Sequence, residues 1–117
     1  MITFKYLYNR LSIKMLTTKE IGKFKKKLQG GEDHLVFIFE ALSNPARLKI
    51  FRLLSKQKDI CVTDVARILG VSVPAASYQF RILEMVGLVE KERMGKMICY
   101  KLKKENPIVR KIIRIVG

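Results

Sequence analysis

Few side chains in this sequence could take part in catalysis or hold a metal ion. The chain has two cysteines, Cys61 and Cys99, and one histidine, His34. A metal centre normally needs three or four convergent ligands, and these residues do not assemble such a set. His34 lies near the expected start of a helix, where a solvent-facing or half-buried role is predicted. We therefore expect neither a metal site nor a cofactor.

The two cysteines are predicted to be reduced thiols at small core or strand positions. Two cysteines do not form a disulfide framework, and no continuous signal-peptide core directs the chain to an oxidising compartment. A redox role for Cys61 stays open, because a helix N-terminus can activate a thiol. The sequence thus predicts a cytoplasmic protein.

No arrangement typical of an enzyme is present either. The sequence has no histidine–nucleophile pair, no phosphate-binding glycine loop and no cluster of carboxylates. The remaining candidates are polar and basic groups that could recognise a partner. We predict that the chain has no catalytic residues and is not an enzyme.

The helix expected at Val73–Met85 carries side chains suited to reading DNA. Small and hydrogen-bonding residues near its start permit close approach to base edges, while tyrosine and arginine can bind phosphate or base. Ser72 is predicted to cap this helix and to belong to the same surface. The outward residues predicted to contact DNA are Pro74, Ala75, Ser77, Tyr78, Gln79 and Arg81. The residues that can pack inward are Val73, Ala76, Phe80, Leu83 and Met85. An ordinary amphipathic surface helix is the alternative.

A basic hairpin is expected after this helix. Two strands, at 88–92 and 97–102, flank the segment Arg93-Met94-Gly95-Lys96. Arg93 and Lys96 would lie at its tip, a position suited to phosphate or minor-groove contact.

The charge balance favours a polyanionic partner. There are 24 Lys and Arg against 10 Asp and Glu, which gives a net charge of +14. Such a field attracts nucleic acid or an anionic membrane, although a lysine-rich surface can also serve solubility. No apolar run approaches the length of a membrane-spanning helix. We therefore expect double-stranded DNA as partner and no membrane association.

These candidate residues need a scaffold, and the pattern of the chain predicts one. A helix is expected at 62–69, and Gly70-Val71-Ser72 forms a tight turn before the helix at Val73–Met85. Other helices are expected at about 33–42, 45–55 and 107–116, with a short strand near 59–62. On the helix at 45–55, Arg47 is expected to point outward. Helix, turn, helix and hairpin together predict a mainly α fold with a small β-hairpin, the winged helix-turn-helix.

Two zones are expected along the chain. Residues 1–31 form a basic leader with a short amphipathic helix, which a Thr17–Glu20 capping box begins. The leader ends at Gly30-Gly31, and the fold needs nothing before Met15, which is an alternative start to Met1. Residues 32–117 form the DNA-binding domain with terminal dimerisation helices.

A dimer is predicted from apolar surface outside the helix-turn-helix pair. The helix at 33–42 is apolar nearly all round, and the last helix has one apolar face. A lone small domain could not easily cover both. The residues predicted to form the dimer interface are Leu35, Phe39, Ile108, Ile112 and Ile113.

The ordered set of motifs resembles the ArsR-type (arsenic-repressor-like) winged-helix regulators over about residues 33–116. The resemblance implies a homodimeric repressor that binds an inverted repeat. Order and spacing agree in four stretches. They are Ala41-Leu42-Ser43-Asn44-Pro45-Ala46-Arg47-Leu48-Lys49-Ile50; Ile60-Cys61-Val62-Thr63-Asp64-Val65-Ala66; Leu69-Gly70-Val71-Ser72 through Ser77-Tyr78-Gln79-Phe80-Arg81-Ile82-Leu83; and Gly87-Leu88-Val89 into Arg93-Met94-Gly95-Lys96 and Tyr100-Lys101-Leu102.

The sequence departs from the metal sites of that family. The family's thiol site uses a Cys-x-Cys pair, but here Thr63 stands at the second position after Cys61. Its other common site draws Asp and His from the C-terminal helix, and residues 107–117 contain neither. The resemblance therefore implies a regulator without the usual metal ligands.

Two other functions remain open on the sequence alone. The chain could be a winged-helix protein-interaction module, although Arg81, Arg93 and Lys96 argue against it. It could also be a non-specific binder of nucleic acid or anionic membrane, driven by the basic leader and tail. Competition by random DNA at fixed salt distinguishes non-specific from specific binding.

Overall fold

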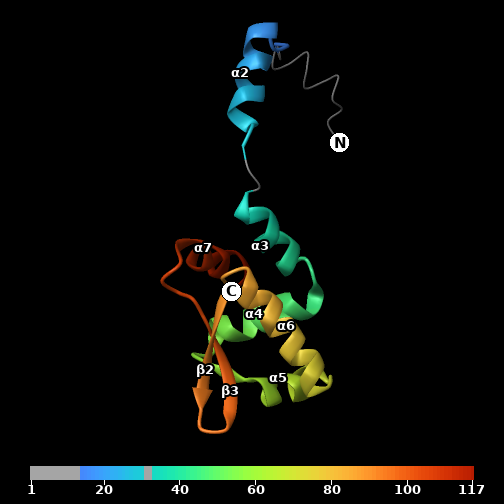
Figure 1. Cartoon of the computed structure of the whole chain (residues 1–117), viewed down its shortest axis with the longest axis vertical. Helices are drawn as coiled ribbons and strands as arrows, with labels where there is room; N and C mark the ends of the chain where they lie inside the picture. The colour runs from blue at the N-terminus through green and yellow to red at the C-terminus, as the bar shows by residue number, and fades with distance from the viewer. Residues whose placement is uncertain (1–13, 31–32) are drawn as a thin grey trace. The chain divides into compact units, whose positions relative to one another are not determined.

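The computed structural model describes residues 14–30 and 33–117. The chain divides into two units, Met1–Glu32 and Asp33–Gly117, which are described separately. No helix in the described part is long and apolar enough to cross a membrane. The first unit contains α2(Thr18–Leu28). The second contains α3(His34–Leu42), α4(Pro45–Lys56), β1(Ile60–Cys61), α5(Val62–Leu69), α6(Val73–Met85), β2(Val89–Met94), β3(Met97–Leu102) and α7(Pro107–Val116) (Figure 1).

Helix α2 begins with the predicted capping box. The Thr17 hydroxyl accepts a hydrogen bond from the Glu20 backbone N–H at 3.2 Å, and the Glu20 carboxylate accepts one from the Thr17 N–H at 3.0 Å. The backbone hydrogen bond from Thr17 lowers the pKa of the Glu20 carboxyl, because it stabilises the charged form. The reciprocal bonds satisfy backbone donors that a helix start otherwise leaves open.

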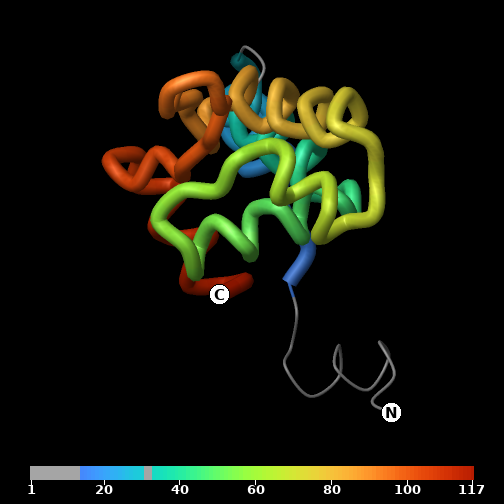
Figure 2. Tube along the Cα trace, turned by 90° about the horizontal axis from the view of Figure 1, so that it is seen from below, coloured from blue at the N-terminus to red at the C-terminus, as the bar shows by residue number. Residues whose placement is uncertain are grey.

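The second unit is organised around a helical core with a small antiparallel sheet. The sheet has three strands in the order β1-β3-β2. Figure 2 shows α6 lying across α4 and α5, and α7 packs against α4. The fully buried centre, where exposure is below 2%, contains Phe51, Phe80, Ile38, Ile50, Leu54, Leu83, Leu88, Val65, Val89, Val109 and Cys99.

One aromatic stack fixes the sheet to α6. The Phe80 and Tyr100 rings lie 4.3 Å apart between centroids and are nearly parallel, at 6°. Phe80 belongs to α6 and Tyr100 to β3, so the stack joins the expected reading helix to the hairpin. Burial raises the pKa of the Tyr100 phenol, and the nearby Glu84 charge adds to this effect.

The hairpin is longer than predicted. Strand β2 runs on to Met94, which pairs with Met97, so only Gly95 and Lys96 form the turn. Arg93 therefore lies in the strand, opposite Ile98, and not at the tip. Gly95 has φ of 65°, which suits a two-residue turn and which a side chain would disfavour.

Three side chains lie differently from the prediction. Val73 and Met85 were expected to pack inward but are 45% and 82% exposed. They are the first and last residues of α6, where the helix extends past the core. Arg47 was expected to point outward, yet it is half-buried and hydrogen-bonded.

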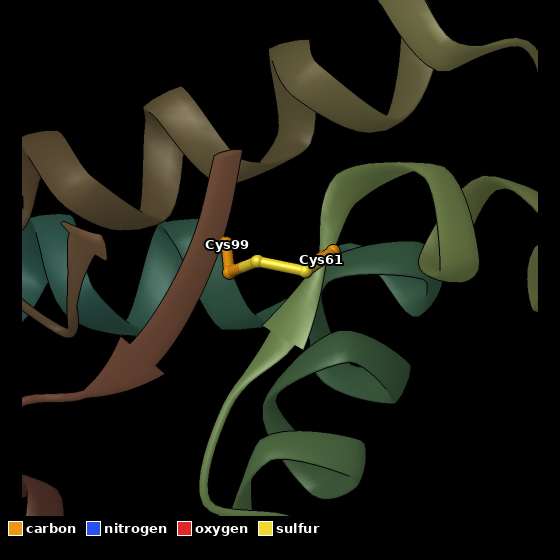
Figure 3. Close-up of a disulfide and its surroundings, with 2 residues drawn as sticks. All are labelled: Cys61 and Cys99. Carbon is orange, nitrogen blue, oxygen red and sulfur yellow. A yellow bond between two sulfur atoms is a disulfide. The ribbon is translucent and has the colours of Figure 1, made fainter. Parts of the chain in front are cut away.

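The prediction that Cys61 and Cys99 are reduced thiols is wrong for this structure. Their sulfur atoms form a disulfide (Figure 3). The two-residue strand β1 pairs with β3 in a register that sets Cys61 directly opposite Cys99. Directly opposed residues on neighbouring strands have close side chains. The prediction weighed the number of cysteines and the compartment, and it lacked this pairing.

Candidate nucleic-acid interface

The turn between α5 and α6 has the geometry that the sequence predicted. Gly70 ends α5 with a φ of 68°, the left-handed conformation that glycine adopts without steric cost. The Ser72 hydroxyl accepts a hydrogen bond from the Ala75 backbone N–H at 3.2 Å and so caps α6. Pro74 lies in the first turn, where a missing N–H costs nothing. These residues set the two helices as a helix-turn-helix pair.

The outer face of α6 presents the residues proposed to contact DNA. Pro74, Ala75, Tyr78 and Arg81 are exposed, whereas Ser77 and Gln79 are half-buried. Their assignment as DNA contacts stays a prediction. Tyr78 also lines a hollow of about 420 Å³ together with residues of α3 and α6.

Arg47 holds Gln79 in place. Its Nη1 donates to Gln79 Oε1 at 2.7 Å, and its Nε donates to the Ala41 carbonyl at 2.6 Å. The side-chain oxygen of Gln79 is therefore engaged, while its amide N–H groups can donate to a base acceptor. One guanidinium thus connects the end of α3 to the face of α6 that is predicted to contact DNA. Sequence reasoning missed this role, because the two residues are 32 positions apart and no local pattern links them.

The hairpin supplies positive charge beside α6, from Arg93 in β2 and from Lys96 in the turn. Arg93 and Lys96 are both exposed. Lower on the hairpin, the Lys101 ammonium lies 3.4 Å from Glu90 and 3.3 Å from Glu92. The hydrogen bonds that the Lys101 ammonium donates to these carboxylates raise its pKa, and the bond to Glu92 has the larger effect. Glu90 and Glu92, which lie on β2, are thus paired with a lysine of the neighbouring strand β3.

The β2–β3 hairpin is the wing of this fold, and Gly95 and Lys96 form its turn, the wing turn. Helix α6 and the wing turn both line a hollow of about 240 Å³. Ser77 of α6, Thr63 of α5 and Lys96 of the turn all line it, with apolar side chains between them. The structure therefore brings together a predicted base-reading residue and a predicted phosphate-binding residue from segments about 20 positions apart. Arg93 does not line this hollow.

The predicted dimer residues differ widely in their exposure to solvent. Phe39 is 62% exposed, whereas Ile112 is 7% exposed and belongs to the core of one chain. Leu35, Ile108 and Ile113 are partly buried against that core. Other exposed apolar side chains on α3 and α7 were not predicted: Val36, Phe37 and Ile115. These helices therefore present apolar surface that a single chain leaves in solvent.

In the described ranges, no three His, Cys, Asp or Glu side chains lie together so that they could hold a metal ion. Thr63 is exposed at the N-terminal end of α5, and Cys61 is bonded to Cys99. The His34 Nε2 lies 3.0 Å from the Val86 carbonyl oxygen, a contact that joins the start of α3 to the end of α6.

Comparisons with known proteins find similarity to bacterial transcriptional regulatory proteins. The family model described as "Bacterial regulatory protein, arsR family" matches residues 44–91, which include α4, α5 and α6. The chain is 38% identical over 69 residues to the cadmium resistance transcriptional regulatory protein CadC homolog of Staphylococcus aureus, covering 59% of this chain and 57% of that protein. It is 32% identical over 85 residues to the cadmium resistance transcriptional regulatory protein CadC of Listeria innocua, covering 72% and 71%.

The chain thus spans little more than half the length of the first of these relatives. A solved structure with the same fold is the homodimeric winged helix-turn-helix DNA-binding domain Mb0332 of Mycobacterium bovis. It is 26% identical, with a TM-score of 0.62, and the match covers 76% of this chain and 86% of that one. The predicted winged helix-turn-helix fold is confirmed.

Proposed function

The chain belongs to the arsR family of bacterial regulatory proteins, and we propose that it is a cytoplasmic homodimeric repressor that binds an inverted repeat in double-stranded DNA. Members of this family are transcriptional regulators and not enzymes. In the proposal, α6 of each subunit enters a major groove, and the wing turn contacts the neighbouring backbone.

One arrangement supports this proposal above others. The exposed polar face of α6 and the basic wing turn border the same hollow, with Ser77 on one side and Lys96 on the other. A major-groove helix with a flanking cation matches the division of labour in DNA recognition, where base contacts specify and phosphate contacts position. Arg81 and Arg93 extend the positive charge of this face.

We propose that DNA binding does not depend on a bound metal. The two relatives named above carry cadmium resistance in their names, which is a property of those proteins. In this chain, the position of the second cysteine of the family's thiol pair is Thr63, and Cys61 is engaged with Cys99.

The dimer is tested by charging the exposed face of α3. Phe39→Asp is expected to raise the dissociation constant of the dimer by more than about a hundredfold, because an apolar interface would have to bury a carboxylate. Sedimentation velocity at micromolar concentration should show a dimer for the parent and a monomer for the variant.

Ile68→Asp is the matched control. Ile68 is 59% exposed, close to the 62% of Phe39, but lies on α5 away from α3 and α7. This variant should remain dimeric. A parent chain that sediments as a monomer yet binds its operator with full affinity would refute the proposed dimer.

The role of the wing is tested by removing its turn cation. Lys96→Ala should weaken binding to operator and to random duplex equally, because a phosphate contact carries no sequence information. The slope of log affinity against log salt should fall by about one unit per subunit. Fluorescence anisotropy titrations over a range of salt measure both effects.

Lys111→Ala removes the same charge from the exposed side of α7 and should leave the slope unchanged. If Lys96→Ala instead weakened only operator binding, the turn would read bases, and the assigned role would be wrong.

A further inference from the structure

The disulfide between Cys61 and Cys99 links the helix-turn-helix pair to the wing, the two parts of the proposed DNA-binding surface. Cys61 is the N-cap residue of α5, the first helix of the helix-turn-helix pair, and Cys99 lies in the wing strand β3 (Figure 3). The bond therefore closes a loop of the chain with a sequence separation of 38, which contains the whole of α6. Any change in this bond acts on both DNA-contacting elements.

The two cysteine residues differ in their exposure to solvent. Cys61 is half-buried and lines an open hollow of about 680 Å³ together with Asp59, Asp64 and Arg67. Cys99 is completely buried. A small dissolved reactant can therefore reach Cys61 and not Cys99. Cys61 would react first with the oxidant, and Cys99 would then react with the oxidised Cys61.

The proposed function places this disulfide in an unusual compartment. A regulator of transcription works where the DNA lies, and thiol pools keep cysteines reduced there. Disulfides in such a compartment are usually transient, and they are catalytic or sense redox conditions. Cys61 is bonded to Cys99, and among residues 14–30 and 33–117 neither cysteine belongs to a group of side chains that could hold a metal ion.

We propose that Cys61 and Cys99 form a reversible oxidation site that takes a hydroperoxide as its oxidant and sets the affinity of the wing and α6 for DNA. This inference rests on the proposed function, since it concerns the regulation of the same surface.

The chemistry balances with the hydroperoxide as the only added oxidant. The Cys61 thiolate attacks the outer peroxide oxygen, the O–O bond breaks, and the departing alkoxide takes a proton and leaves as an alcohol. The Cys99 sulfur then attacks the Cys61 sulfenic acid, the S–O bond breaks, and hydroxide leaves as water with the proton of the Cys99 thiol. Two molecules of a small thiol reverse the bond by exchange and are themselves oxidised to a disulfide.

In this proposal, the oxidised form has the higher affinity for DNA. Strand β1 has two residues, and so short a pairing holds weakly without a covalent bond. With the bond in place, the middle of β3 stays fixed to the start of α5, and the neighbouring Tyr100 stays stacked on Phe80 of α6. A surface fixed in advance loses less conformational freedom on binding, which increases affinity. Reduction should therefore weaken operator binding about tenfold.

The experiment uses the full chain with the DNA upstream of its own gene and a shuffled duplex of equal length. Protein is treated with tert-butyl hydroperoxide or with reduced glutathione, and affinity is measured by anisotropy at fixed salt. Because the chain has two cysteines, alkylation followed by mass spectrometry reports the state of this pair directly. Cys61→Ser and Cys99→Ala, checked by melting curves, should bind alike under both treatments.

The inference is supported if the peroxide forms the bond, glutathione breaks it, and the oxidised parent binds the upstream DNA about tenfold more tightly. Three results would overturn it: equal affinity of the two states, tighter binding by the reduced state, or a bond that glutathione leaves intact. The last would identify a structural disulfide. If neither state distinguishes the upstream DNA from the shuffled duplex, the proposed function itself fails, and alkylation still shows whether the thiols react.

Discussion

Replacing Phe80 with alanine is expected to lower the free energy of unfolding by about 3–5 kcal/mol. Phe80 is completely buried and stacks on Tyr100, so the change leaves a cavity and removes an aromatic pair. The stack is also one of the contacts that join α6 to the wing. A small domain has a total stability of about 5–15 kcal/mol, so the variant should lose much of its folded population and its operator binding.

Urea denaturation at one fixed protein concentration measures this loss, since the stability of a dimer depends on concentration. Tyr78→Ala is the matched control: it removes an aromatic ring from the same helix at a position that is 55% exposed. It should change stability by less than about 1 kcal/mol. Equal losses in the two variants would mean that α6 is not held to the sheet by Phe80.

The second large effect is expected at Gln79. Gln79→Ala should cost about 1–3 kcal/mol in binding to the operator and little in binding to random DNA, because base contacts carry the discrimination. Arg47 engages the amide oxygen and leaves the amide N–H groups as the atoms that we propose to read a base. Parallel titrations of operator and shuffled duplex at one salt concentration give the two affinities.

Two further variants separate reading from packing. Gln79→Glu keeps an oxygen that can accept from Arg47 but lacks the N–H donors, so it should retain stability and lose discrimination. Gln57→Ala, at the exposed end of α4, should change neither. If Gln79→Ala, Tyr78→Ala and Ser77→Ala all left discrimination intact, α6 would not be the reading helix.

Local signals in the sequence predicted most of the helix-turn-helix. The bounds of α5 and α6 agree with the prediction at every residue, because Gly70 and Ser72 end one helix and begin the next through their own backbone and side-chain chemistry. The capping box of α2 and the Asn106 cap of α7 were predictable for the same reason. These features depend on residues within four positions of each other.

Two side-chain contacts that the prediction lacked are long-range. Arg47 meets Gln79 across 32 positions, and Cys61 meets Cys99 across 38. Such pairings arise only when helices dock and strands align, and a single sequence carries no local signal for them. The same holds for Ile112, which has the pattern of an interface residue but packs into the core of its own chain.

The central claim is that the surface of α6 and the wing distinguishes one DNA sequence from others. The most direct test is the ratio of two affinities of the full-length parent, for the DNA upstream of its gene and for a shuffled duplex, measured in competition at one physiological salt concentration. A ratio of about 10³ or more, with protection of two half-sites about one helical turn apart, is the predicted result. A ratio near one would contradict the claim, because it would mean that the +14 charge binds DNA without reading it.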